Sequence, residues 1–218
     1  MDLDISQLSN VLAMWMCLVV LLSFHEFAHA WMAYKCGDDT ARIMGRMTIN
    51  PVVHIDPLGT VFIPLAMLLL SPDFIVFGWA KPVPVNPSNL SSRKRDDILI
   101  SMAGPAMNII LAFVLMFVLR LMELSPSISN SAIVEQLPEI ALISLFLCFF
   151  NLIPIPPLDG SHVMRHVVGM SEEMYYSIAK WGLLILILIL NFFPIVGFVI
   201  YNITLAVREL MKVLLLFP

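Results

Sequence analysis

Long apolar runs constrain the fold of this chain more than any other feature. A helix needs about 20 predominantly apolar residues to cross the hydrocarbon core of a bilayer. Four runs come close to that length: Leu8–Tyr34, Ile98–Met122, Ala132–Ile153 and Tyr176–Phe192. A further run, Ile195–Leu216, carries charged residues near its end. Only 13% of the residues are charged, against roughly 25% in a soluble domain. We therefore predict an all-α polytopic membrane protein with about four to six transmembrane helices.

A shorter apolar run, Val61–Leu70, has prolines near both ends. Runs of that length are more often re-entrant than spanning. Lys and Arg are concentrated in residues 35–97 and 154–180, whereas residues 123–138 contain none. By the positive-inside rule, the two basic stretches face the cytoplasm. We therefore expect Val61–Leu70 to enter and leave the membrane on that side.

Three ionisable residues, His25, Glu26 and His29, stand within five positions of the first apolar run. Such residues are costly inside a membrane, so they indicate a functional site. His-Glu-x-x-His on a helix places two imidazoles one turn apart on one face, a spacing that suits two zinc ligands. The intervening Glu26 can act as general base for a water that the metal activates. The motif predicts a zinc hydrolase inside the membrane, although a buried polar cluster between helices is an alternative reading.

A catalytic zinc usually takes three protein ligands, and Asp159 is the strongest third candidate. Several prolines follow Ile153, so the preceding helix should end there and the chain should run extended to Asp159. If Val61–Leu70 is re-entrant, one crossing separates the two helices, and Asp159 reaches the same side of the membrane as His25. Asp159 could instead cap a helix that begins at Ser161.

At this point the sequence resembles the site-2 proteases, zinc proteases that cut transmembrane segments of other proteins. The resemblance rests on His25-Glu-Phe-Ala-His29 together with Asn151-x-x-Pro-x-Pro-x-Leu-Asp159-Gly160. Further similar motifs are Gly45-Arg-Met-Thr-Ile-Asn-Pro51, His54-Ile-Asp-Pro57-Leu-Gly59, Gly78–Asn86 and Ala103-Gly-Pro-Ala-Met-Asn108.

The resemblance, which is closest to short prokaryotic members without PDZ or CBS domains, implies the parts of the reaction. It implies one Zn²⁺ per chain, bound by His25, His29 and Asp159, with Glu26 as base and Asn151 near the scissile carbonyl. It places the protein in a prokaryotic inner (plasma) membrane with its active site towards the cytoplasm, and makes a transmembrane segment of another protein its substrate. Asn151 and Asn108 could equally be structural residues between helices.

A substrate helix must unwind before its backbone can be attacked, and freed backbone groups in lipid need new partners. A small membrane-associated β-hairpin or edge strand could supply them by β-addition, and prolines fit an edge strand. The segment expected to do so contains Phe77, Gly78, Trp79, Ala80, Lys81, Pro82, Val83, Pro84, Val85 and Asn86. An interfacial loop anchored by Trp79 is the alternative.

Three other histidines need an assignment. His162 and His166 are also one helical turn apart, but no Glu lies between them and Arg165 beside them disfavours a cation. We interpret this pair as part of a solvated cytoplasmic face. His54 lies in a proline-flanked loop, where it could orient a site group or cap the loop.

We expect one membrane domain over residues 1–218, with a catalytic core at about 8–165 and membrane helices at 174–218. No basic stripe indicates nucleic acid as a partner; the expected surroundings are the lipid bilayer. A metal-binding membrane protein without hydrolysis, either a transporter or an inactive scaffold, is the alternative function. A transporter would place polar residues along a path through the membrane, whereas here they cluster on one side.

Overall fold

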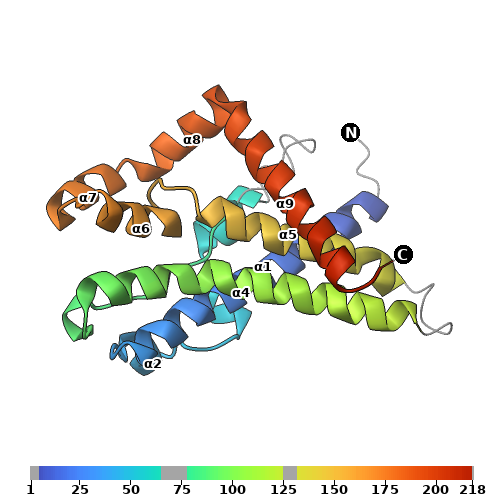
Figure 1. The fold of residues 1–218 in the computed structure, drawn as a ribbon, viewed down its shortest axis with the longest axis horizontal. Helices are drawn as coiled ribbons and strands as arrows, with labels where there is room; N and C mark the ends of the chain where they lie inside the picture. Colours follow the sequence, from blue (N-terminus) through green and yellow to red (C-terminus); the bar gives the residue numbers. More distant parts are fainter. Residues whose placement is uncertain (1–4, 65–77, 125–131, 218) are drawn as a thin grey trace. The chain divides into compact units, whose positions relative to one another are not determined.

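The computed structural model describes residues 5–64, 78–124 and 132–217, which are mostly helical (Figure 1). The chain divides into two compact units, Met1–Ser91 and Ser92–Pro218. Each unit is described by itself below. Compact units need not be separate domains, so the single domain expected from the sequence stays a prediction.

The first unit is built on one long helix, α1 (Ile5–Lys35), followed by the single turn α2 (Thr40–Ile43). Three short helices then each begin with a proline: the 3₁₀ helix η1 (Pro51–His54), the π-helix η2 (Pro57–Phe62) and the 3₁₀ helix η3 (Pro87–Asn89). An Asn or Asp precedes each proline, and its side chain accepts a hydrogen bond from a backbone N–H of the new turn. Proline needs no hydrogen-bond partner at the first helical position, so this pairing starts each turn efficiently.

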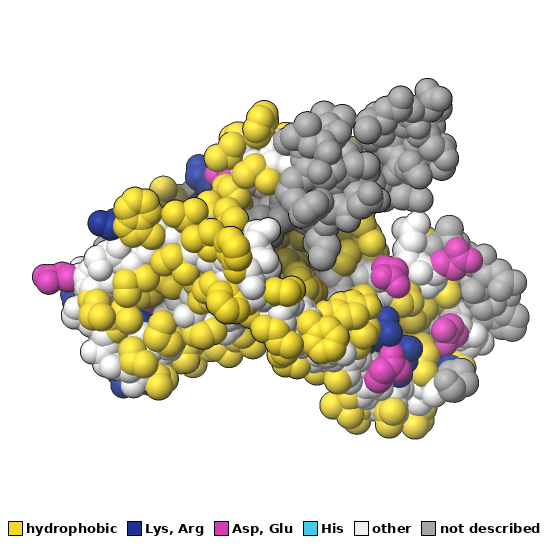
Figure 2. Space-filling model, turned by 90° about the horizontal axis from the view of Figure 1, so that it is seen from above, with side chains coloured by type: hydrophobic (Ala, Val, Ile, Leu, Met, Phe, Trp, Pro, Cys, Tyr) yellow, Lys and Arg dark blue, Asp and Glu magenta, His cyan; other side chains and the backbone are white. Residues whose placement is uncertain are grey.

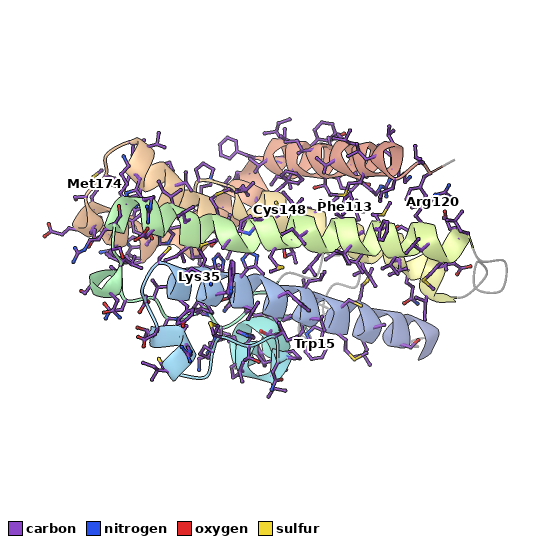
Figure 3. All side chains as sticks on the ribbon, turned by 60° about the horizontal axis from the view of Figure 1, so that its bottom comes forward. Trp15, Lys35, Phe113, Arg120, Cys148 and Met174 are labelled. Atoms are coloured by element: carbon purple, nitrogen blue, oxygen red, sulfur yellow. The ribbon has the colours of Figure 1, made fainter. Side chains whose placement is uncertain are left out.

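The loop between α1 and Ser91 leaves one end of α1 and returns to the same end. The N–H of Asn86 donates to Asp38, directly after α1, at 2.7 Å. Between these points the loop reaches far along the helix, because the Trp15 indole donates to the carbonyl of Thr60 at 2.7 Å. Trp15 and Lys35 lie well apart on α1 (Figure 3), about 30 Å at a rise of about 1.5 Å per residue. Residues 65–70 of the expected re-entrant run lie outside the described residues.

The second unit contains α4 (Arg93–Glu123), α5 (Ala132–Asn151), α6 (Asp159–Val167), α7 (Glu172–Ala179), α8 (Gly182–Phe192) and α9 (Pro194–Leu214). In Figure 1, α4 and α5 lie side by side along much of their length. Small and large apolar side chains from α4, α5 and α9 form a buried core: Ala112, Met116, Leu119, Leu137, Ala141, Leu145 and Met211. This core joins the C-terminal half of α4 to the first part of α5 and to the end of α9.

Within the described ranges, four helices are long and apolar enough to cross a membrane: Leu12–Lys35, Arg93–Glu123, Ile133–Asn151 and Pro194–Leu214. Among the described side chains on the face shown in Figure 2, hydrophobic ones predominate over charged ones. The prediction of an integral membrane protein is confirmed. One predicted span differs, since Tyr176–Phe192 is divided between α7 and α8, which meet at a bend of 60°.

No β-strand occurs in the parts of the chain that the structure describes, so the predicted β-hairpin or edge strand is not supported. Residues 78–86, which lead to η3, form neither a helix nor a strand in the structure. Their backbone N–H groups instead bind separate partners: that of Lys81 donates to the carbonyl of His54, and that of Val83 to a side chain of α1. Pro82 and Pro84 have no N–H, which removes two donors that a β-ladder would use. Phe77 lies outside the described residues.

Candidate metal centre

Two histidines of α1 form a compact pair. His25 and His29 are both buried, at 4% and 9% exposure, and their Nε2 atoms are 3.0 Å apart. In a tetrahedral zinc site, two nitrogens at about 2.0–2.1 Å from the metal lie about 3.3 Å apart. The pair therefore needs only a small opening to bind one zinc ion, and its nitrogen donors suit that metal.

The carboxylate of Glu26, beside His25 on α1, has a backbone partner. Its Oε2 accepts a hydrogen bond of 2.9 Å from the N–H of Val83. Val83 stands between two prolines, so its N–H is the only backbone donor of the Pro82–Pro84 stretch. This contact fixes one carboxylate oxygen and leaves the other able to accept a proton from a water molecule.

The extended segment Gly78–Asn86 is tied to the rest of the first unit along its length. The carbonyl of Trp79 accepts from the Thr60 hydroxyl at 2.7 Å. The N–H of Lys81 donates to the carbonyl of His54 at 2.9 Å, and the carbonyl of Lys81 accepts from the Arg46 guanidinium at 2.6 Å. These contacts hold the part of the segment that precedes Val83, and a contact at Asn86 holds the part that follows it.

Asp38 holds the far end of this segment, and sequence reasoning missed it. Its side chain is fully buried and accepts hydrogen bonds from the backbone N–H groups of Asn86 and Thr40 and from the side chain of Asn89. Burial opposes ionisation of Asp38, but these hydrogen bonds and that of the Thr40 hydroxyl outweigh burial and lower its pKa. A lone Asp after a helix gives no sequence signal of such a role, because its partners lie about 50 residues away.

His54 supports the same loop. Its ring is 1% exposed, and its Nε2 lies 2.8 Å from the carbonyl of Thr48. A carbonyl only accepts hydrogen bonds, so Nε2 carries the hydrogen. His54 thus contacts Thr48 through its ring and Lys81 through its backbone carbonyl, and both roles considered from the sequence stay predictions.

Asp159 is the first residue of α6, in the second unit. The N-cap position is Leu158, and no side chain caps this helix, so Asp159 does not act as the cap of a helix starting at Ser161. The next residue, Gly160, packs very closely on the end of α5: a Cβ there would lie 2.2 Å from the carbonyl oxygen of Leu152. Gly160 therefore lets the start of α6 lie directly against the residues that follow α5.

The two asparagines take part in helix contacts. The side-chain amide of Asn151 donates to the carbonyl of Leu147, one turn earlier, at 2.9 Å. An amide nitrogen has two hydrogens, so a second donor remains. The buried Asn108 accepts at its backbone carbonyl from the Ser144 hydroxyl at 2.8 Å, which joins α4 to α5. This contact uses the backbone of Asn108, so the role of its side chain stays a prediction.

The interpretation of His162 and His166 as a solvated face is wrong. Both rings contact the carboxylate of Asp97 in α4, at 3.2 Å and 2.7 Å, and the side chain of His166 is only 14% exposed. Arg165 between them contacts the same carboxylate at 2.9 Å. The spacing of three basic residues on one face of a short helix was the available signal for an acidic partner.

Comparison with known proteins gives a consistent result. The model of "Peptidase family M50" matches residues 13–129 and 121–193. YwhC of Bacillus subtilis, named as a zinc metalloprotease, is 37% identical over 88% of this chain and 85% of its own length. Rip2 of Mycobacterium tuberculosis, also named as a zinc metalloprotease, is 28% identical over 84% of this chain and 67% of its own. No solved structure gives a significant match.

Proposed function

Because this chain belongs to peptidase family M50, the site-2 protease family, and is a zinc metalloendopeptidase of the membrane, we propose that it cleaves a peptide bond within or near a transmembrane segment of another membrane protein. The observation that carries the proposal is the buried His25–His29 pair, with Glu26 between them, on a helix able to span the bilayer. The family also disfavours the alternative of a transporter or inactive scaffold.

The cofactor of such an enzyme is Zn²⁺. His25 and His29 from the first unit and Asp159 from the second are the residues that we assign to it. Two imidazoles and one carboxylate are a common ligand set of catalytic zinc, and they leave a position for water or substrate. When bound, the zinc ion lowers the pKa of a water molecule and polarises the scissile carbonyl.

Glu26 acts as the general base. Its Oε2 is held by the N–H of Val83, which keeps the carboxylate from rotating freely. Glu26 takes a proton from the attacking water and returns it to the leaving amine. We assign Asn151 as a donor to the oxyanion that develops on the scissile carbonyl, through the amide hydrogen that does not bind Leu147. The loss of such a donor costs about 10²–10³ in rate in a well-studied protease.

The unwound substrate lies along residues Gly78–Asn86. The contact between Val83 and Glu26 is what supports this assignment, because a substrate that follows the segment passes the base. The segment is already extended and tied down by Arg46, His54 and Asp38, so little ordering is needed when substrate binds. Carbonyl groups and side chains of the segment, rather than a β-ladder, would contact the substrate.

Cleavage takes place towards the cytoplasmic side. His25 lies about 15 Å from Lys35 at a rise of about 1.5 Å per residue, and Lys35 is the basic end of α1. The basic residues that follow α1 support a cytoplasmic position for this end.

Cleavage of a reconstituted substrate tests this proposal. The purified chain and its Glu26→Gln variant would be placed in liposomes with a panel of single-span model segments that carry helix-weakening residues. We expect wild type to cut at least one segment, chelation of zinc to stop the reaction, and Glu26→Gln to retain zinc but lose cleavage. Equal cleavage by Glu26→Gln, or cleavage that survives complete zinc removal, would contradict the mechanism.

A further inference from the structure

Three basic side chains on one face of α6 converge on a single carboxylate. Asp97 Oδ1 lies 3.2 Å from Nδ1 of His162. Asp97 Oδ2 lies 2.9 Å from the Arg165 guanidinium and 2.7 Å from Nε2 of His166. A carboxylate in this form only accepts hydrogen bonds, so both histidines donate to it. A single residue of α4 therefore contacts three side chains of α6, which lie on successive turns of that helix.

The contacts are partly shielded from water, which makes these interactions stronger than exposed ion pairs. The side chain of Arg165 is 7% exposed and that of Asp97 19%. The Arg165 guanidinium also lies over the ring of Tyr175, 5.1 Å from its centroid. Exposed ion pairs contribute little, but shielded charge-assisted bonds are stronger, and removal of one partner leaves the others without compensation.

The cluster is not arranged as a second metal site. The Arg165 guanidinium contacts the same oxygen of Asp97 as His166 does and lies 3.3 Å from His166 Nε2. It occupies the place where a cation would have to bind. Arg165 therefore already supplies the positive charge beside Asp97, and the cluster fixes the position of α6 instead of binding a metal ion.

What it holds is the helix that begins with Asp159. α6 has nine residues, and Asp159 lies on the same face as His162 and His166 because these positions are three and seven apart. At the N-terminal end of α6, Gly160 packs against the carbonyl groups of Leu152 and Ile153. At the other end, the side chains of α6 bind Asp97. Together these contacts restrict rotation of α6 about its own axis.

Small rotations matter here. Side-chain ends lie about 5–6 Å from a helix axis, so a rotation of about 10° moves the Asp159 carboxylate by about 1 Å. Metal–ligand distances must hold within about 0.2 Å. The Asp97 contacts are placed to limit such a rotation, because they bind side chains on the face of α6 that also contains Asp159.

We propose that Asp97 is a positioning residue for the metal centre: by binding His162, Arg165 and His166, it fixes α6 and thereby the Asp159 carboxylate. The proposal rests on the assignment of Asp159 as a zinc ligand made above. Asp97 itself touches neither metal nor substrate in this account.

The test measures metal binding by the full-length chain in detergent. Zinc affinity is obtained by competition with a chromophoric chelator, and the ligand field from the visible absorption of the Co²⁺-substituted protein. We expect Asp97→Asn to weaken zinc binding by about 10–100-fold, the effect typical of an outer partner of a metal ligand, and to change the Co²⁺ bands. Asp97→Glu, which keeps the acceptor, should recover part of both.

Glu172→Gln is the matched control, because it makes the same acid-to-amide change. Glu172 is 50% exposed and 3.9 Å from Arg165, so we expect wild-type zinc affinity and spectrum. If Asp97→Asn does not fold, His162→Leu and His166→Leu each remove one donor to Asp97 and should each weaken zinc binding severalfold.

Wild-type affinity and Co²⁺ spectrum in folded Asp97→Asn, or in both histidine variants, would overturn the positioning role while leaving the protease assignment intact. A wild-type chain that binds no zinc would overturn the proposed function itself, and this proposal with it.

Discussion

Glu26, on a helix long and apolar enough to span the membrane, accepts a hydrogen bond of 2.9 Å from the backbone N–H of Val83, in a loop segment. This pair links the base of the proposed reaction to the surface along which the substrate is proposed to lie. Arg46, His54 and Asp38 bind the same segment at other points. These contacts fix the position of Val83, so that its N–H can orient the Glu26 carboxylate.

Val83→Pro removes this donor while keeping an apolar side chain. A hydrogen bond to a charged group is worth about 1.5–3 kcal/mol, so we expect kcat to fall about tenfold or more with zinc content unchanged. Val83→Ala keeps the N–H and is the matched control, with near wild-type kcat. Steady-state cleavage of a model transmembrane segment measures both. Wild-type kcat in folded Val83→Pro would show that Glu26 does not need this contact.

Asp38→Asn should destabilise the protein in a pH-dependent way. The folded-state pKa of Asp38 is lowered relative to an unfolded value of about 3.9. A lowered pKa contributes stability that is complete above the unfolded pKa and is lost as pH falls through the folded pKa. The difference in Tm between wild type and Asp38→Asn, measured in detergent, should therefore be largest near pH 7 and shrink below about pH 4.

Asp39→Asn provides the control for that experiment, because Asp39 is the exposed neighbour of Asp38 and its side chain caps no helix. We expect little change in Tm for Asp39→Asn at either pH. A Tm difference for Asp38→Asn that stays constant or grows on acidification would contradict the assignment of a lowered pKa to Asp38.

Gly160→Ala should disturb the start of α6. The added Cβ would lie 2.2 Å from the carbonyl oxygen of Leu152 and 2.8 Å from that of Ile153, and backbone atoms cannot move away cheaply. We expect lower Tm and reduced zinc content. Gly197→Ala, where nothing lies within 4 Å of the new Cβ, should be neutral or stabilising by about 0.5–1 kcal/mol in its helix. Equal behaviour of the two variants would mean that the close packing at Gly160 is not required.

Much of the membrane architecture could be predicted because hydrophobic length alone determines which segments can span a bilayer. The break between α7 and α8 could not be predicted from the sequence. Gly182 packs there with its Cα so close to Pro156 that a Cβ would lie 2.4 Å from the carbonyl oxygen of Pro156, and such an approach between distant residues leaves no mark in hydropathy.

The candidate zinc ligands of α1 could be predicted from the sequence, because helical spacing by itself brings His25 and His29 together. The roles of Asp38, Arg46 and Asp97 could not be predicted, since their hydrogen-bond partners lie far along the chain. Asp97 in particular stands in a charged stretch at the start of α4, which from sequence alone is typical of a solvated helix end. For residues 78–86 the sequence predicted a β-hairpin or edge strand, but no β-ladder forms there, because the N–H groups of Lys81 and Val83 bind separate partners.

The most direct test of the central claim is the zinc content of the purified wild-type chain beside Asp159→Ala. We expect about one zinc per wild-type chain, as a site of two histidines and one carboxylate requires, and its loss or marked weakening in the variant. Wild-type zinc content in folded Asp159→Ala would contradict the assignment of Asp159 as a ligand, because the third ligand would then lie elsewhere and the two distant motifs would not form one site.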